Sequence, residues 1–262
     1  MRSKLTYPPI PTFSIKTSNM NLCIDIGNTR VKLAVFDATS TLVDLVLHPT
    51  LEQDVIRRLL SQYAVTAVIL SSVRADHQAI RTWLATKVQS VYWLDTELQV
   101  PIQNHYLTPQ TLGKDRLAAV VGAVARYPHQ NILVVDAGTC ITYDFVDKQR
   151  NYWGGSILPG LQMRLNAMTH FTAKLPALQL EVPKDWIGNT TVSAMQTGVF
   201  WGVLHELEGF KHQYSAKYGA ITLVITGGDS TYFESQLKNE IFAQPNLVLI
   251  GLNTILEYNE GL

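Results

Sequence analysis

Cysteine and long hydrophobic runs are both scarce in this sequence of 262 residues. The two cysteines, Cys23 and Cys140, lie far apart and form no C-x-x-C pair. This argues against a disulfide scaffold or a zinc knuckle and favours a reducing compartment. The longest apolar segments, such as 118–125, are much shorter than the roughly 20 residues that cross a membrane. We therefore expect a cytoplasmic protein that does not span a membrane.

An excess of charge of either sign is also missing. Lysine and arginine total 21, and aspartate and glutamate also total 21, so the formal net charge is zero. Nucleic-acid-binding domains usually carry a basic surface, and membrane-surface anchors carry basic clusters. The balance argues against nucleic acid and against a membrane as partners. It leaves open a small number of charged residues gathered in one site.

Several common catalytic motifs do not occur. The sequence contains no G-x-x-x-x-G-K-[ST], no G-x-G-x-x-G, no G-x-S-x-G and no H-E-x-x-H. A P-loop, a Rossmann dinucleotide site, a hydrolase nucleophile elbow and a zinc protease are therefore not indicated. The seven histidines show no metal-ligand spacing.

A repeated pattern dominates what is present. Residues 21–26 and 31–36 read as two strands joined by a polar turn, and residues 131–135 and 141–146 read the same way. Superposing the two segments aligns Asp25 with Asp136 and Gly27 with Gly138. We interpret this as an internal duplication that produces two related α/β lobes. The N-terminal lobe would comprise 20–128 and the C-terminal lobe 129–262. Residues 1–19 carry three prolines and no continuous apolar segment, so we expect either a disordered extension there or a start codon placed too early.

The remaining elements follow from periodicity, glycine and proline. Further strands are expected at 41–47, 67–71, 90–94 and 221–226. Helices are expected at 51–62, 76–88, 112–126, 163–168 and 191–214, with a final helix near 231–240. The segment 154–160 reads as a glycine- and proline-rich loop.

Each repeated turn places a carboxylate at the end of a buried strand, followed at once by glycine. Successive backbone N–H groups in such a turn can form an anion-binding nest, and Asn28, Thr29 and Thr139 could donate further hydrogen bonds to phosphate. Asp25 and Asp136 would repel phosphate directly, so they make sense if they hold a cation that bridges to it. A single turn of this kind could equally be a plain hairpin. Two such turns in duplicated lobes favour a functional site over plain hairpins.

Asp115 stands where a helix is expected to begin. A carboxylate at that position is stabilised by the helix dipole and can serve only as a cap. It could also act as a general base that accepts a hydroxyl proton during phosphoryl transfer. Residues 112–116 alone leave both interpretations open.

The sequence holds an ordered set of motifs. They are Asp25-Ile-Gly-Asn-Thr29, Tyr106 with Leu112-Gly-Lys-Asp-Arg116, Asp136-Ala-Gly-Thr139, Gly154-Gly-Ser-Ile-Leu-Pro-Gly160, Thr191-Val-Ser-Ala-Met-Gln-Thr-Gly198 and Thr226-Gly-Gly228. This ordered set resembles the type III pantothenate kinases and covers nearly everything from Met20 onward. The resemblance implies the acetate and sugar kinase/actin-like fold, with two ribonuclease H-like lobes. It also implies ATP-dependent phosphorylation of the primary hydroxyl of pantothenate to 4'-phosphopantothenate, the first step of coenzyme A biosynthesis.

The resemblance also implies roles for individual residues. Asp115 would be the proton acceptor, and Asp136 would ligate a monovalent cation. The ATP-binding residues would be Asp25, Ile26, Gly27, Asn28, Thr29, Arg30, Val31, Lys32, Thr139, Gly227 and Gly228. The pantothenate-binding residues would be Tyr106, Gly113, Lys114, Asp115, Arg116 and Thr191. Lys114 and Cys140 stand where many members carry alanine, and we expect both to be tolerated.

The cofactors and partners implied are K⁺ or NH₄⁺, a divalent cation such as Mg²⁺ with ATP, and a second copy of the chain. The pantothenate pocket would lie at the interface of that homodimer, so Thr191 would reach it from or near the partner chain. Two alternatives stay open: another phosphotransferase of the same fold, such as a sugar kinase or exopolyphosphatase, and a non-catalytic accessory factor for transcription.

Overall fold

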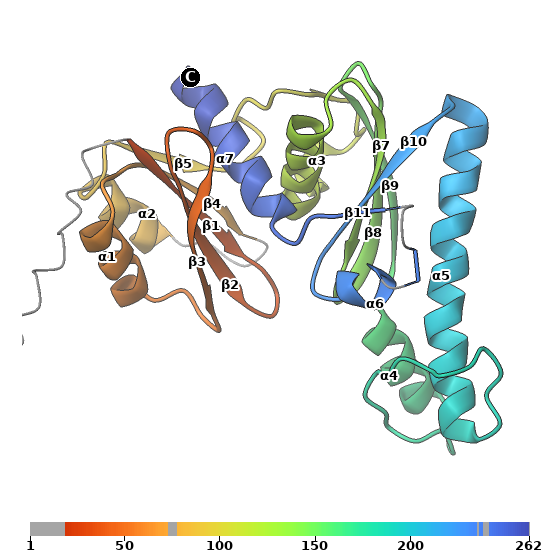
Figure 1. The fold of residues 1–262 in the computed structure, drawn as a ribbon. Helices are drawn as coiled ribbons and strands as arrows, with labels where there is room; N and C mark the ends of the chain where they lie inside the picture. Colours follow the sequence, from red (N-terminus) through yellow and green to blue (C-terminus); the bar gives the residue numbers. More distant parts are fainter. Residues whose placement is uncertain (1–18, 73–77, 235, 238–240, 262) are drawn as a thin grey trace, which may run out of the picture.

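The structure of the chain is a computed structural model that describes residues 19–72, 78–234, 236–237 and 241–261. All of the extension expected at 1–19 except residue 19 therefore lies outside the described residues. The first two residues of the helix expected at 76–88 also lie outside them. Two sheets lie side by side, with helices between them and on their outer faces (Figure 1). In the described part of the chain, no helix is long and apolar enough to cross a membrane.

The strands of the first sheet are β1 (Met20–Ile26), β2 (Val31–Phe36), β3 (Leu42–His48), β4 (Val65–Ser72) and β5 (Ser90–Trp93). Those of the second are β6 (Gln103–Asn104), β7 (Asn131–Ala137), β8 (Cys140–Val146), β9 (Asn151–Pro159), β10 (Ile221–Thr226) and β11 (Phe242–Ala243). The α-helices are α1 (Gln53–Gln62), α2 (Gln78–Ala85), α3 (Lys114–Arg126), α4 (Leu161–Phe171), α5 (Thr191–Tyr218), α6 (Ser230–Glu234) and α7 (Leu247–Glu260), with a short 3₁₀ helix at Pro109–Thr111.

The two sheets share one topology. The first has the order β3-β2-β1-β4-β5, and the second contains β9-β8-β7-β10-β11 with β6 added at the β9 edge. In each, the first three strands pair antiparallel and the last two join in parallel. The repeat read from the sequence is therefore a structural duplication, and the prediction of two duplicated lobes is confirmed. The lobe boundary at residue 128 stays a prediction, because two elements lie with the lobe on the other side of it. Strand β6 comes before residue 128 but joins the second sheet, and helix α7 comes after it but packs on the first sheet.

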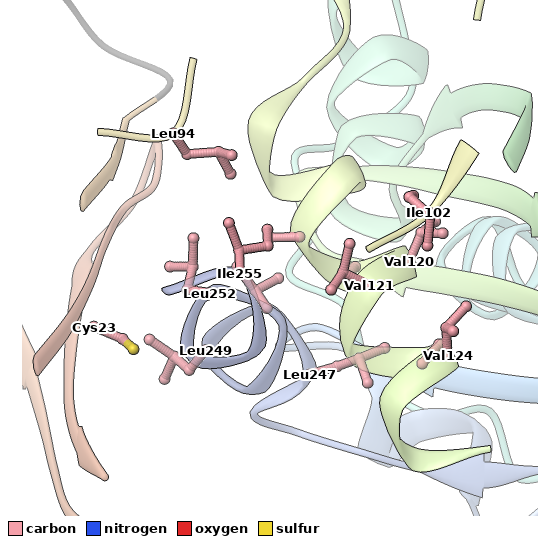
Figure 2. Close-up of a cluster of buried hydrophobic side chains, with 14 of the residues drawn as sticks. Cys23, Leu94, Ile102, Val120, Val121, Val124, Leu247, Leu249, Leu252 and Ile255 are labelled. Carbon is pink, nitrogen blue, oxygen red and sulfur yellow. The ribbon is translucent and has the colours of Figure 1, made fainter. Parts of the chain in front are cut away.

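Three hydrophobic cores hold the layers together. One lies between the first sheet and α1 and α2, and another lies between the second sheet and α4, α5 and α6. The third fills the space between the two sheets around α3 and α7. Figure 2 shows this central core, with Leu249 of α7 beside Cys23 of the first sheet and Leu247 beside Val124 of α3.

The helices α3 and α7 cross at unusually short range. A Cβ atom on Gly122 of α3 would lie 2.3 Å from the carbonyl oxygen of Leu247, and one on Gly251 of α7 would lie 1.8 Å from that of Ala118. Both distances are far below a normal contact, so only glycine lets the two backbones touch. The crossing fixes how far apart the two sheets stand, because α3 also packs on β7 and α7 packs on β1 and β4.

Two sequence-based predictions were wrong. The segment expected to be a loop at 154–160 is mostly strand β9, which runs through Gly154 and Gly155. Glycine is needed there because a Cβ on Gly155 would lie 1.6 Å from the Tyr143 carbonyl oxygen, and because Gly154 adopts φ +84°. The ladder is irregular at this point, next to Phe145, so the glycines mark a distorted strand rather than a turn.

The final helix was also misplaced. Among the described residues near 231–240, which leave out 235 and 238–240, the structure has the short helix α6, whereas the last helix is α7, which was not predicted. Helix α7 is enclosed by the first sheet on one side and α3 on another, and most of its residues are buried. A helix that is apolar on most sides shows little 3.6-residue periodicity, so the pattern gave no signal.

Replacing Gly251 by alanine tests the role of the crossing. The added methyl group would overlap the backbone of α3, which cannot move without shifting a whole lobe. We expect Gly251→Ala to lower the free energy of unfolding by about 3 kcal/mol, at the upper end of overpacking costs. Gly209→Ala in α5 is the matched control, since no atom lies within 4 Å of its Cβ position; it should gain about 0.5–1 kcal/mol. Urea unfolding measures both, and an unchanged midpoint for Gly251→Ala would contradict the argument.

Candidate active site

Two aspartates from the two sheets face the space that holds α3 and α7. Cys23 on β1 packs into the central core, and side chains alternate along a strand, so Asp25 faces the same way. The same argument from Val134 on β7 places Asp136 on the corresponding face of the second sheet. Asp115 lies in the first turn of α3, between the sheets. The duplication thus supplies two carboxylates, and α3 supplies a third.

The charges of these groups influence one another. Burial raises the pKa of Asp25 to about 6; Lys32 acts to lower this pKa, whereas Asp115 and Asp136 raise it further. Burial likewise raises the pKa of Asp136 to about 6, with Asp115 and Asp144 raising it and Lys32 lowering it. Lys32 is the residue paired with Asp25 across β1 and β2. The structure therefore joins Asp25, Lys32, Asp115 and Asp136 in one mutually interacting group.

The two Asp-x-Gly turns are tight hairpins with exposed polar tips. The Gly27 amide donates to the Arg30 carbonyl oxygen at 3.2 Å, and the Gly138 amide donates to that of Cys140 at 3.0 Å. Asn28, Thr29, Arg30 and Thr139 are exposed. By contrast, the side chains of Ile26 and Val31 are buried in the outer core. Only their backbone atoms are available to a ligand at the turn.

The turn after β7 is held by two neighbouring glycines. A Cβ on Gly160 would lie 2.1 Å from the Gly138 carbonyl oxygen, and one on Gly227 would lie 2.5 Å from Oδ1 of Asp136. Gly227 also has φ +94°, which favours glycine. The segment after β10 is therefore packed directly against the Asp136 turn. Gly228 follows with open space around it.

Asp115 is fixed by the start of α3. Gly113 is the N-cap, with no side-chain cap, and Lys114 is the first helical residue. Asp115 Oδ1 accepts the Arg116 amide at 2.8 Å. A Cβ on Gly113 would come within 2.6 Å of that same oxygen, so glycine leaves room for the carboxylate. The dipole of α3 favours negative charge at this end.

Arg116 is held in a buried polar cluster beside these carboxylates. Its guanidinium forms a two-pronged ion pair with Asp144 on β8, with Nη2 at 2.6 Å and Nε at 3.0 Å from the carboxylate oxygens. Burial acts to lower the pKa of Arg116, but the hydrogen bonds and charge of Asp144 outweigh this and raise it. Tyr152 donates its hydroxyl to Asp144 at 2.7 Å. The Tyr106 ring lies 5.6 Å from the Arg116 guanidinium carbon and stacks parallel to Tyr152.

Sequence reasoning missed Asp144 and Tyr152. A signal existed for Asp144, because it is a carboxylate in the middle of the apolar strand Cys140–Val146 and so needs a buried partner. Tyr152 carried no such signal, since it lies between the strand predicted at 141–146 and the loop predicted at 154–160, where no element was predicted.

The structure does not bring Thr191 to this group. Thr191 is the exposed first residue of α5, and its neighbour Thr190 caps the helix together with Ser193. Figure 1 shows the beginning of α5 beside α4 and well away from α3. Every other sequence-predicted side chain lies in or next to the two turns, the start of α3 or the Arg116 cluster.

The donor set suits a hydrated cation better than an enclosed one. Among the described residues, no three Asp, Glu, His or Cys side chains gather closely enough to ligate one metal ion. Magnesium is commonly held by one or two carboxylates, several waters and substrate phosphates. Carboxylates whose pKa values are raised by burial and mutual repulsion would gain from such a positive charge.

Comparisons with known proteins agree with this geometry. Residues 21–213 match the type III pantothenate kinase family. The chain is 43% identical over 242 residues to a type III pantothenate kinase of Bacteroides fragilis, covering 92% of this chain and 99% of that protein. It is 42% identical over 243 residues to one of Phocaeicola vulgatus, covering 93% of this chain and 100% of that protein.

Solved structures support the fold. A conserved protein of Campylobacter jejuni, assigned to the Baf family of transcriptional activators, has a TM-score of 0.60 at 22% identity, covering 92% of this chain and 100% of that one. A protein of Sinorhizobium meliloti assigned as a 2-dehydro-3-deoxygalactonokinase has a TM-score of 0.58 at 12% identity, with the same coverage. These likenesses confirm the predicted sugar kinase/actin-like fold and carry no more than the fold.

The raised pKa of Asp25 predicts a stability that falls as the pH rises. The folded chain holds the Asp25 proton up to about pH 6, whereas the unfolded chain loses it near pH 4, so stability is lost as the pH rises through this window. Asp25→Asn should therefore raise the unfolding temperature at pH 8 by roughly 2–6 °C and leave it unchanged at pH 4. Asp37→Asn is the control of opposite sign: hydrogen bonds from Thr39 and Thr41 lower the pKa of Asp37, so this variant should lose stability at pH 8. Thermal unfolding at both pH values decides, and an Asp25→Asn variant that melts lower at pH 8 would refute the assignment.

Proposed function

This chain belongs to the type III pantothenate kinase family, and we propose that it transfers the γ-phosphoryl group of ATP to the primary hydroxyl of pantothenate, giving 4'-phosphopantothenate. The product is the first intermediate on the route to coenzyme A. The observation that carries the proposal is that Asp25 and Asp136, one on the inner face of each sheet, are both influenced by the charge of Asp115 at the start of α3.

ATP would lie between the two turns. The phosphates would contact the backbone and side chains of residues 25–32 and Thr139, and the adenosine would lie near Gly227 and Gly228. The support is geometric: both turns present exposed polar tips, and Gly227 packs against Asp136. Lys32 would place positive charge next to the phosphates, where charge develops during transfer.

Pantothenate would bind at the start of α3. Tyr106 and Arg116 form one side of the site, and Gly113, Lys114 and Asp115 form the adjoining helix start. The ion pair with Asp144 keeps the Arg116 guanidinium in a fixed orientation. Such a fixed cation would attract the carboxylate of pantothenate without costly reorganisation.

Asp115 would act as the general base. As the pantothenate oxygen bonds to the γ-phosphorus and the bond to the ADP oxygen breaks, the hydroxyl proton passes to the Asp115 carboxylate. The start of α3 keeps this carboxylate in place through the Arg116 amide. Asp25 and Asp136 would hold the cations that neutralise the charge of the phosphates.

Two cations would complete the site. A divalent ion such as Mg²⁺ would enter with ATP near Asp25, and K⁺ or NH₄⁺ would bind at Asp136. The support for the second ion is a shortage of positive charge. Lys32 lies opposite Asp25, whereas the residue opposite Asp136 is the neutral Thr142.

A second copy of the chain would complete the pantothenate pocket. Thr191 is exposed and lies apart from Asp115 within one chain, so it would act from or near the partner. Exposed apolar side chains surround the beginning of α5 and are suited to an interface: Val182, Trp186, Ile187 and Val192. The two cysteines are unpaired in the structure, which supports the cytoplasm as the compartment.

The first test is a coupled kinase assay with purified protein. We expect ATP-dependent turnover of pantothenate when K⁺ or NH₄⁺ is present, and little in buffer with Na⁺ alone. A panel of sugars and polyphosphate should give no turnover under the same conditions. Turnover of a sugar but not of pantothenate would reject the substrate, and full activity in sodium would reject the monovalent site.

The role of Asp115 is tested by Asp115→Asn. The amide keeps the shape of the side chain but accepts a proton poorly, so kcat should fall by about 10²–10⁴. Binding of ATP should change little, since Asp115 is assigned to the acceptor. Asp185→Asn, an exposed change in the segment before α5, is the control and should leave ATP binding intact. A near-normal kcat for Asp115→Asn would show that another group takes the proton.

A further inference from the structure

Ser71 lies at the end of β4 and takes no part in the function described so far. Its side chain is completely buried. Among the residues that the structure describes, its hydroxyl oxygen has no hydrogen-bond partner. Most buried polar groups in native proteins are paired, and an orphan usually marks a water, an ion or a catalytic role.

The sheet aims this hydroxyl at the carboxylate group. Ser71 is the parallel-strand partner of Asp25. Ile69, two residues earlier on β4, packs into the central core, as Cys23 does two residues before Asp25. Because side chains alternate, Ser71 and Asp25 point to the same face, on strands about 4.8 Å apart. That face is the one on which Asp25 senses Asp115 and Asp136.

The second lobe repeats the arrangement. Thr226 is the parallel-strand partner of Asp136 and is also buried. Each aspartate thus has a buried hydroxyl-bearing residue as its partner on the adjoining parallel strand. A hydroxyl that recurs at equivalent positions is more than a local accident of packing.

We propose that Ser71 is a positioning residue whose hydroxyl holds the water through which Asp25 binds the divalent cation of ATP. The assignment rests on the proposed use of ATP. A serine hydroxyl can donate one hydrogen bond and accept others, so it can orient a water beside a carboxylate. Magnesium usually retains several of its waters, and groups that orient the ligands of a metal strongly affect its binding.

The test uses the full chain with Ser71→Ala, Ser71→Thr and Thr66→Ala. Thr66 lies near the opposite end of β4, so Thr66→Ala is the control. Thermal unfolding of the free proteins is measured first. Calorimetry then measures binding of a non-hydrolysable ATP analogue, once with Mg²⁺ and once with a chelator.

Removing an unpaired hydroxyl should not destabilise the free protein, so Ser71→Ala should melt at or above the wild-type temperature. Its affinity for the Mg²⁺ complex should fall about 10- to 100-fold, with no change in the chelator. Ser71→Thr keeps the hydroxyl, as Thr226 does in the second lobe, and should recover most of the affinity. Thr66→Ala should bind like the wild type.

Three results would overturn the assignment: unchanged affinity of Ser71→Ala for the Mg²⁺ complex, an equal loss of nucleotide affinity with and without the metal, or a lower melting temperature that reveals a structural partner.

The pantothenate assay separates the Ser71 assignment from the proposed kinase activity. If the wild type leaves pantothenate unmodified but Ser71→Ala loses Mg²⁺-dependent affinity, the substrate assignment fails and the Ser71 assignment holds. A wild type that binds no Mg²⁺–nucleotide complex would refute both.

Discussion

Gly122 and Gly251 let α3 and α7 cross with their backbones in contact, and this crossing sets the distance between the two sheets. Each sheet carries one aspartate on its inner face, and α3 carries the third. Neither of the two outer cores brings these groups together, whereas the central core around α3 and α7 contacts both sheets. The site exists because α7, the last helix of the chain, returns to the first sheet and packs against α3. The chemistry therefore depends on a contact far from any reacting atom.

The site costs stability. Burial and mutual repulsion raise the pKa values of Asp25 and Asp136 to about 6, so ionising them at neutral pH works against folding. The neighbouring cluster is different: Asp144 has Arg116 and Tyr152 as partners and is fully satisfied. The protein thus keeps one buried carboxylate paired to hold Arg116, and leaves others short of positive charge. Under the proposed function, that shortage would favour binding of a cation carried by phosphate.

Much of this arrangement could be predicted from the sequence. The repeated strand–turn–strand pattern was enough to find Asp25 and Asp136, because a carboxylate that ends a buried strand before glycine is visible in local sequence. Most helices and strands with clear periodicity were predicted as well. The failures were non-local. Helix α7 is apolar on most sides, so it shows little periodicity. The glycines of β9 are required by close contacts with Tyr106 and Tyr143, which are distant in sequence. The partners of Arg116 and Asp25 come from strands that only the fold places beside them.

The duplication also explains how one topology supports two roles. In the first lobe Asp25 lies between Lys32 and Ser71, whereas in the second Asp136 lies between Thr142 and Thr226. The parallel neighbour is a buried hydroxyl in both, but only the first lobe places a fixed cation on the antiparallel neighbour. Under the proposed function, phosphate oxygens would therefore bind more favourably beside Asp25, where Lys32 is already present. Neither strand partner of Asp136 is positively charged, and the Lys32 that lowers its pKa belongs to the other lobe. The exchange of lysine for threonine at this strand position thus gives the two aspartates different electrostatic surroundings within one topology, and under the proposed function it would favour phosphate beside Asp25 and a free cation beside Asp136.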